Sequence, residues 1–219
     1  MTGKQGFQGN LSANEILNQF RSLPEFRNLT NMVYMGMGEP LDNLAEVLKS
    51  LEIMTSEWGY GWSPTRITVS TVGLLSPIRE FLEKSRCNLA VSLHSPFDDE
   101  RRKLMPIQRT NTVEEVLNII RNFDFNSQRR VSFEYILFEG MNDTPRHIKE
   151  LARILNGIKC RINIIRFHEI PGSDFKSPGI KETNDFKEAL NRKGIITTIR
   201  ASRGVDITAA CGLISILQQ

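Results

Sequence analysis

The chain has 219 residues and a mass of 25.0 kDa, with 40% hydrophobic and 24% charged residues. This is an ordinary globular balance with enough apolar residues for one hydrophobic core, and an α/β barrel of this size is permitted. The net charge of +3 is too small to indicate nucleic-acid binding by itself. No segment is long and apolar enough to span a bilayer and no apolar signal segment opens the chain, so we expect a soluble, cytoplasmic protein.

Strand-like and helix-like segments alternate from one end of the chain to the other. The β-rich runs lie at 32–35, 66–71, 88–94, 130–137, 161–167 and 196–200. Apolar residues at helical spacing occur at 44–54, 113–120 and 148–155. Helix starts are expected at the capping boxes of Ser12 with Glu15 and Thr112 with Glu115, and at Pro145 after Thr144. Gly157 and Gly194 stand where helices should end. Repeated strand–helix units predict a parallel sheet with right-handed crossovers.

The cysteines are Cys87, Cys160 and Cys211. They are far apart, odd in number and form no Cys-x-x-Cys pair, which argues against a disulfide framework and against a zinc site. A reducing compartment is their natural setting.

Polar residues stand at the carboxyl ends of the expected strands, where ligands bind in barrels and open α/β sheets. They are Glu39, Ser70, Ser92, His94 and His168. A single polar residue would mark only the start of a loop, whereas a series of them favours a ligand site. Basic clusters at 101–103 and 129–130 would fit phosphate contacts, although such clusters are usually solvated surface.

The first expected strand ends in the string MGMGEP, in which two glycines allow close backbone approach and a carboxylate can hold an ammonium group. Four further motifs follow the same order as in one known family. They are GKQGFQGNLSANEI before that strand, and ITVSTVGL, AVSLHSPFDDERRKLMPI and RASRGVDITAACG after it. Together the five motifs resemble the RlmN-type RNA adenine-C2 methyltransferases, which are radical-SAM enzymes acting on large-subunit rRNA and certain tRNAs. The resemblance covers essentially the whole chain, residues 1–219, as one radical-SAM core with a C-terminal extension.

The resemblance implies roles for individual residues. Gly38 and Glu39 match the residues that bind the backbone and amino group of S-adenosylmethionine, and Ser70 matches a serine that contacts this cofactor. Ser92, Leu93 and His94 match the SLH stretch that lies along it. His168 stands where many members have asparagine, so this contact departs from the family pattern.

Cys211 matches the cysteine that first accepts a methyl group from one S-adenosylmethionine, although a cysteine among small residues is by itself usually a buried apolar side chain. In the family, a 4Fe–4S cluster supplies the electron that cleaves a second S-adenosylmethionine. The resulting radical activates the S-methyl group for addition to adenine. Cys87 and Cys160 match no family role, and we expect them to be structural.

The cluster motif Cys-x-x-x-Cys-x-x-Cys does not occur in these residues. In the family it immediately precedes the residue that matches Met1, so we expect an incomplete (β/α) TIM-like barrel lacking the first strand and the cluster loop. The fragment should neither turn over nor bind S-adenosylmethionine tightly. The implied partners are rRNA, tRNA and an electron donor such as flavodoxin, and the oligomeric state stays open. The alternatives are a Cfr-type adenine-C8 methyltransferase, a non-catalytic nucleotide- or RNA-binding barrel, and an ordinary phosphate-binding barrel enzyme.

Overall fold

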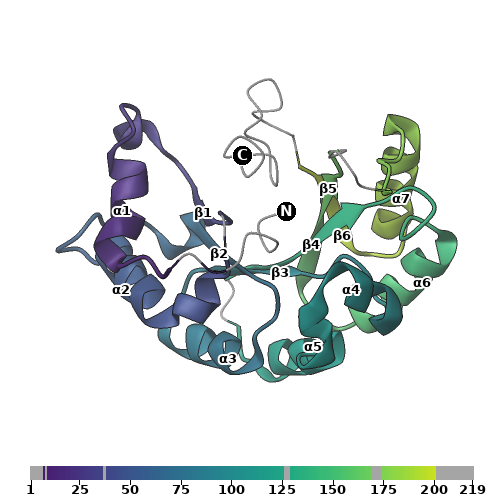
Figure 1. Ribbon diagram of the computed structural model, residues 1–219, viewed down its shortest axis with the longest axis horizontal. Coiled ribbons are helices and arrows are strands. Elements are labelled where there is room, and N and C mark those ends of the chain that lie inside the picture. The colour runs from purple at the N-terminus through teal and green to yellow at the C-terminus, as the bar shows by residue number, and fades with distance from the viewer. Residues whose placement is uncertain (1–6, 8, 37, 126–128, 169–173, 201–219) are drawn as a thin grey trace.

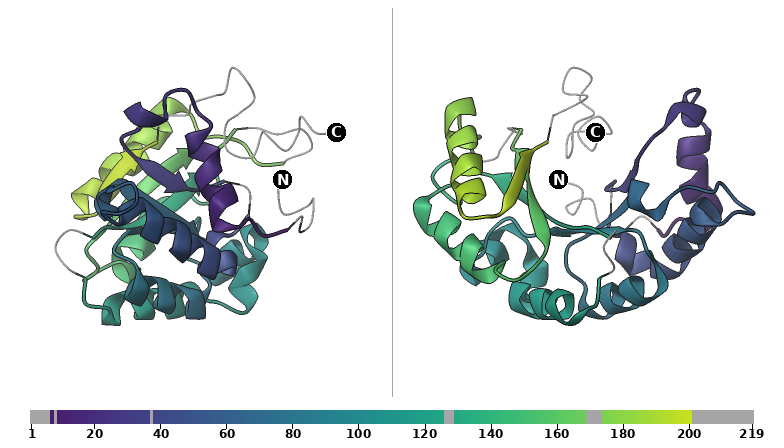
Figure 2. Two further views of the ribbon diagram at one scale, coloured as in Figure 1. Left: turned by 90° about the vertical axis from the view of Figure 1, so that its left-hand side faces the viewer. Right: turned by 180° about the vertical axis from the view of Figure 1, so that it is seen from behind.

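The computed structural model describes residues 7, 9–36, 38–125, 129–168 and 174–200. Within these ranges six parallel strands form one sheet, in which the order in space is the order along the chain. The strands are β1 (Met32–Tyr34), β2 (Ile67–Thr71), β3 (Asn88–Ser92), β4 (Val131–Leu137), β5 (Cys160–Arg166) and β6 (Ile196–Ile199). Figure 1 and Figure 2 show that the sheet curves into an open arc with the helices on its convex side. Among the described residues no strand pairing joins β1 to β6, so the expected incomplete barrel with parallel strands is confirmed.

Seven α-helices of the described residues cover the convex side of the sheet. They are α1 (Ala13–Arg21), α2 (Leu44–Thr55), α3 (Leu75–Lys84), α4 (Asp98–Leu104), α5 (Val113–Asn122), α6 (Pro145–Ile154) and α7 (Ile180–Arg192). Both expected capping boxes are present, with Ser12 and Thr112 as N-caps of α1 and α5. Gly157 and Gly194 follow α6 and α7 with φ of +78° and +83°, the left-handed conformation that ends many helices.

The hydrophobic core lies between the sheet and the helices. Alternate residues of each strand point to opposite faces of the sheet. On β2 the residues facing the helices, such as Ile67 and Val69, are fully buried, whereas Thr68 and Ser70 on the concave side are half-buried. On β4 the fully buried Phe133 and Tyr135 face the helices. Apolar residues therefore face the helices, and polar side chains line the concave side of the arc.

One strand and two basic clusters differ from the sequence-based expectations. The strand expected at 88–94 ends at Ser92, because the backbone turns at His94, which has a φ of +57°.

In the basic clusters at 101–103 and 129–130, Arg101 is completely buried and Arg129 is 8% exposed, so neither cluster is a continuous solvated surface. The Arg129 guanidinium lies 5.1 Å from the centre of the Phe81 ring and donates to the carbonyls of Leu82 and Ser85 at the end of α3. Arg129 thus caps a helix C-terminus.

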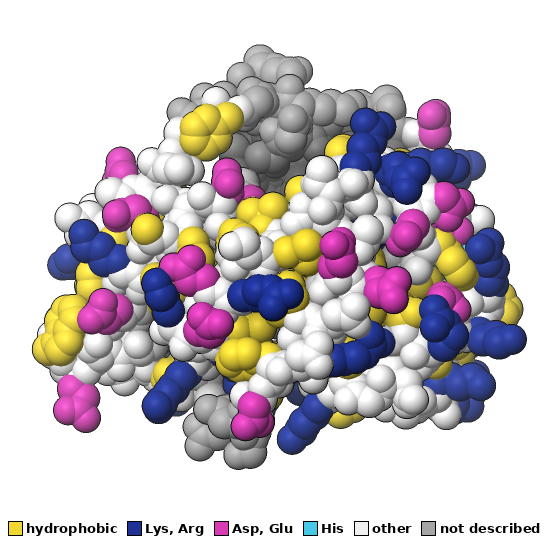
Figure 3. All heavy atoms as spheres, turned by 90° about the horizontal axis from the view of Figure 1, so that it is seen from below, with side chains coloured by type: hydrophobic (Ala, Val, Ile, Leu, Met, Phe, Trp, Pro, Cys, Tyr) yellow, Lys and Arg dark blue, Asp and Glu magenta, His cyan; other side chains and the backbone are white. Residues whose placement is uncertain are grey.

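The surface seen from the helical side carries positive and negative side chains interspersed with one another (Figure 3). Such mixing is typical of solvated protein surface. No helix among the described residues has the length and apolarity needed to cross a bilayer.

Candidate functional site at the carboxyl ends of the strands

The parallel sheet brings the polar strand ends to one edge, as expected. Ser70 lies near the end of β2 and Ser92 ends β3, while His168 follows the end of β5 by two residues. Glu39 follows β1 and contacts the segment after β2 directly, because its Oε2 accepts a hydrogen bond of 2.7 Å from the Val72 amide. Among the described residues the hydroxyls of Ser70 and Ser92 have no hydrogen-bond partner, which leaves them available to a ligand. Cys211 lies outside the described residues.

Glu39 is held in place by the backbone around it. Its Oε1 accepts from the Leu41 amide at 3.1 Å, which caps a short 3-10 helix (Pro40–Asn43). Burial raises the pKa of the carboxyl, while hydrogen bonds with the Val72 amide, the Thr71 side chain and the Leu41 amide oppose that shift. The two carboxylate oxygens have about four acceptor sites, more than these amides and the Thr71 side chain use, so the group can also receive an ammonium. Gly38 has a φ of +107°, and a Cβ there would meet no described atom within 4 Å. Conformation, and not crowding, is therefore what favours glycine at this position.

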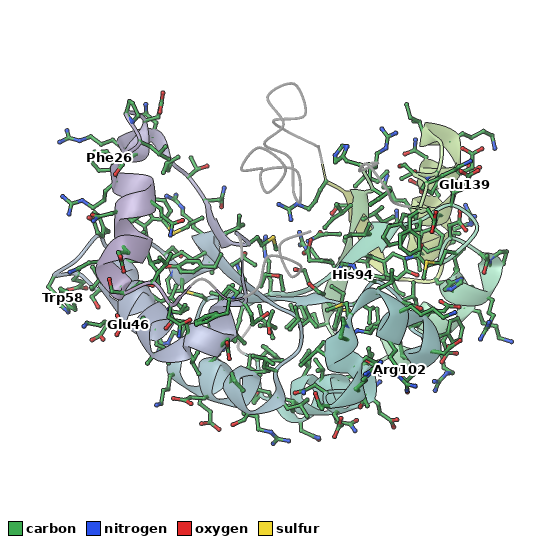
Figure 4. The ribbon with its side chains drawn as sticks, in the orientation of Figure 1. Phe26, Glu46, Trp58, His94, Arg102 and Glu139 are labelled. Atoms are coloured by element: carbon green, nitrogen blue, oxygen red, sulfur yellow. The ribbon has the colours of Figure 1, made fainter. Side chains whose placement is uncertain are left out.

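His94 lies on the inner side of the arc, close to β3 and β4 (Figure 4). Its Nδ1 accepts a hydrogen bond of 3.0 Å from the Ile136 amide, which assigns the ring proton of the neutral form to Nε2. Burial, and then the positive charge of Arg101, lower the pKa of His94 to about 3. His94 is thus a neutral hydrogen-bond donor near pH 7.

This low pKa predicts a pH dependence of stability. The unfolded chain takes up a proton on His94 below about pH 6.5, whereas the folded chain does so only near pH 3. Above pH 6.5 His94 therefore causes no loss in the free energy of unfolding. This free energy declines as the pH falls from 6.5 toward 3. We expect His94→Asn, which tolerates the left-handed backbone, to reduce the slope of unfolding free energy against pH by up to about 1.4 kcal/mol per unit between pH 6.5 and 5. Urea unfolding followed by tryptophan fluorescence measures this slope, and equal slopes for both proteins would contradict the assignment.

A cavity of about 280 Å³, lined by both polar and apolar residues, opens on the concave side of the sheet. Glu134 of β4 is 2% exposed and is among the residues that line it. Its carboxylate accepts from Asn163 at 2.7 Å, from Ser132 at 3.2 Å and from Arg200 at 3.4 Å. The cavity is also lined by arginines, namely Arg66, Arg130, Arg161 and Arg200. With one carboxylate against four guanidinium groups among its described residues, the cavity suits a ligand that carries negative charge.

The two described cysteines lie at the opposite edge of the sheet. Cys87 precedes β3 and Cys160 begins β5. Burial raises the pKa of both thiols, that of Cys160 to about 12, so neither is a thiolate at neutral pH. Within the described part of the chain no three histidine, cysteine or acidic residues gather as metal ligands. These observations agree with the structural role expected for Cys87 and Cys160.

Sequence reasoning missed the buried polar residues behind the strand ends. The Arg101 guanidinium donates to the carbonyls of Val72, Ser92 and Leu93, and the Asn142 amide donates to that of His94. In the sequence Arg101 stands in a run of charged residues and Asn142 in a loop. No local signal distinguishes either from a surface residue.

The model of the Radical SAM superfamily matches residues 2–155. The chain belongs to this superfamily. It is 55% identical over all 219 residues to a probable dual-specificity RNA methyltransferase RlmN of Bacteroides fragilis, and covers 64% of that protein. It is 59% identical over 215 residues to the protein of the same name from Porphyromonas gingivalis W83, covering 98% of this chain and 63% of that protein. The chain thus spans less than two thirds of the curated relatives that it matches.

A solved structure supports the same superfamily assignment. The crystal structure of a radical SAM methyltransferase from Sphaerobacter thermophilus superposes with a TM-score of 0.90 at 39% identity, covering 96% of this chain and 64% of that one. Members of the superfamily use S-adenosylmethionine and a 4Fe–4S cluster. The described residues fit S-adenosylmethionine. The Glu39 carboxylate suits its amino group, and the hydroxyls of Ser70 and Ser92 and the neutral His94 ring suit its other polar atoms. The described residues do not fit the cluster, because the described cysteines are separated in sequence and lie at the opposite edge of the sheet.

Proposed function

We propose that the whole protein containing these residues is an RNA methyltransferase of the RlmN type, which methylates C2 of adenine in large-subunit rRNA and in tRNA. The observation that carries this proposal is the gathering of Glu39, Ser70, Ser92 and His94 at one sheet edge. The chain that carries them is 55% identical over 219 residues to a protein named as a probable dual-specificity RNA methyltransferase RlmN. Cytoplasmic location and reduction by a flavodoxin-like donor belong to the same proposal.

The proposed roles of the residues follow from their chemistry. Glu39 binds the ammonium of S-adenosylmethionine, while Gly38 lets the ligand approach the backbone. Ser70, Ser92 and His94 donate or accept hydrogen bonds along the cofactor, next to the backbone of Leu93, and His168 contributes a further polar contact. Cys211 carries the methyl group as a thioether before it reaches RNA. When bound, S-adenosylmethionine supplies both the methyl group and the radical precursor.

Residues 1–219 contain no Cys-x-x-x-Cys-x-x-Cys. A 4Fe–4S cluster in the proposed enzyme must therefore be held by residues other than these. We propose that residues 1–219 alone do not turn over, and that they bind S-adenosylmethionine weakly because the open iron of the cluster is a main anchor for this cofactor.

One experiment tests both the proposed activity of the whole protein and the proposed inactivity of residues 1–219. The whole protein, with its cluster reconstituted under anaerobic conditions, is incubated with methyl-labelled S-adenosylmethionine, a reductant and ribosomal RNA or tRNA, and residues 1–219 are assayed in parallel. We expect labelled 2-methyladenosine by mass spectrometry from the whole protein and no methylated nucleoside from residues 1–219. Formation of 8-methyladenosine would instead support the Cfr-type alternative. RNA or nucleotide binding without any methylation would support a non-catalytic barrel.

A further inference from the structure

Three consecutive backbone carbonyls of the stretch 92–94 are held by buried side chains. The carbonyls of Ser92 and Leu93 accept from Nη2 and Nε of Arg101 at 3.0 and 3.2 Å, and that of His94 accepts from Nδ2 of Asn142 at 2.7 Å. The β3 strand itself ends at Ser92. At the end of β3, side-chain donors therefore hold these three backbone carbonyls.

Arg101 connects this stretch to the loop that holds Glu39. Its Nη2 also donates to the Val72 carbonyl at 2.8 Å. The Val72 amide in turn donates to the Glu39 carboxylate. The Arg101 side chain is completely buried, and its far side is held by Gln108, which in turn donates to Asp98. One guanidinium thus joins the ends of β2 and β3. A lysine in its place could not reach these carbonyls together, because an ammonium is a point donor and lacks the planar fork of arginine.

Asn142 joins the end of β3 to the end of β4. Its Nδ2 also donates to the Ile136 carbonyl, and its Oδ1 accepts from the Phe138 amide, each at 2.7 Å. The side chain is completely buried. Ile136 is also the residue whose amide donates to the His94 ring. Asn142 therefore fixes the left-handed turn at His94 and the orientation of its imidazole at the same time.

We propose that Arg101 and Asn142 are positioning residues that hold the S-adenosylmethionine-contacting strand ends in their binding geometry, an inference that rests on the proposed function. Neither residue needs to touch the cofactor. They fix the backbone of Ser92 and His94, and Arg101 also fixes Val72, whose amide holds the Glu39 carboxylate. A shift of about 1 Å in such supports costs up to roughly a hundredfold in function.

The test uses the whole protein with its cluster and measures 5′-deoxyadenosine formed from S-adenosylmethionine under reduction. The variants are Arg101→Lys and Asn142→Asp, the second being nearly isosteric but without the two N–H donors. Matched controls make the same changes at exposed positions, as Arg102→Lys and Asn156→Asp. Figure 4 shows Arg102 in the outer, helical layer. All rates are measured well below the thermal midpoint of each variant.

We expect Arg101→Lys and Asn142→Asp each to raise the KM for S-adenosylmethionine by roughly tenfold to a hundredfold, with a smaller change in kcat. The controls keep the wild-type KM. A residue that only stabilises the fold would lower the thermal midpoint and leave the KM unchanged, so an unchanged KM in both folded variants overturns the inference. If Arg101→Lys does not fold, Gln108→Met replaces it and should raise the KM about fivefold. A wild-type protein that neither cleaves nor binds S-adenosylmethionine overturns the proposed function and this inference together.

Discussion

Replacing Cys211 with alanine in the whole protein should abolish methylation of position 211 and of RNA. The proposed route needs a sulfur that accepts a methyl group by displacement and then presents it to adenine, and alanine offers no such atom. We expect RNA methylation to fall by at least roughly a thousandfold, as when an enzyme loses its nucleophile. Anaerobic incubation with labelled S-adenosylmethionine, followed by peptide and nucleoside mass spectrometry, measures both products.

The other cysteines supply matched controls for this change. Cys87→Ala and Cys160→Ala remove thiols whose pKa values are raised by burial and which lie at the opposite edge of the sheet. Both variants should therefore retain RNA methylation. Methylation that survives in Cys211→Ala would refute the methyl-carrier role, and a loss confined to Cys87→Ala or Cys160→Ala would move that role to another thiol.

Replacing Glu39 with glutamine should weaken the binding of S-adenosylmethionine by roughly tenfold to a hundredfold, since a charge-assisted hydrogen bond is worth about 1.5–3 kcal/mol. Glutamine lacks the negative charge that holds an ammonium. Its amide nitrogen would also face one of the two backbone amides that Glu39 now accepts, from Leu41 and Val72. The KM for S-adenosylmethionine in reductive cleavage, measured with the whole protein, reports the loss.

Glu46→Gln is the matched control for Glu39→Gln. Glu46 is also half-buried and also accepts from a backbone amide, that of Ala13 at 2.6 Å, but it lies on α2 away from the strand ends (Figure 4). Glu39→Gln should cost more folding stability than Glu46→Gln, because Glu39 accepts from two backbone amides and Glu46 from one. Only Glu39→Gln should raise the KM. An equal KM for Glu39→Gln and the wild-type protein would refute the ammonium-binding role.

The sequence was sufficient to predict the strands and their parallel arrangement, because β-branched runs and helical spacing are local signals. It was less informative for α4, a helix of seven residues, six of them charged, without an apolar stripe. The polar strand ends could also be anticipated, since parallel strands bring their carboxyl ends to one edge.

The residues behind those strand ends could not be predicted. Arg101 and Arg102 are neighbours of the same type, yet one is completely buried and the other is exposed. The difference arises because Arg101 faces carbonyls of β3 and of the loop after β2, the latter 29 residues away in sequence. Asn142 likewise depends on the meeting of β3 and β4. Such contacts exist only once the sheet has formed.

The arc of the sheet has a mechanical consequence. Each strand pairs only with its neighbours in sequence, through five parallel pairings, and among the described residues no pairing links β1 with β6. The separation of the two rims is therefore set by the summed twist of the pairings and not by a hydrogen-bonded closure. Small changes of twist in the individual strand pairings add up along the arc. Within the described residues, the distance between the two rims can therefore change without breaking any strand pairing.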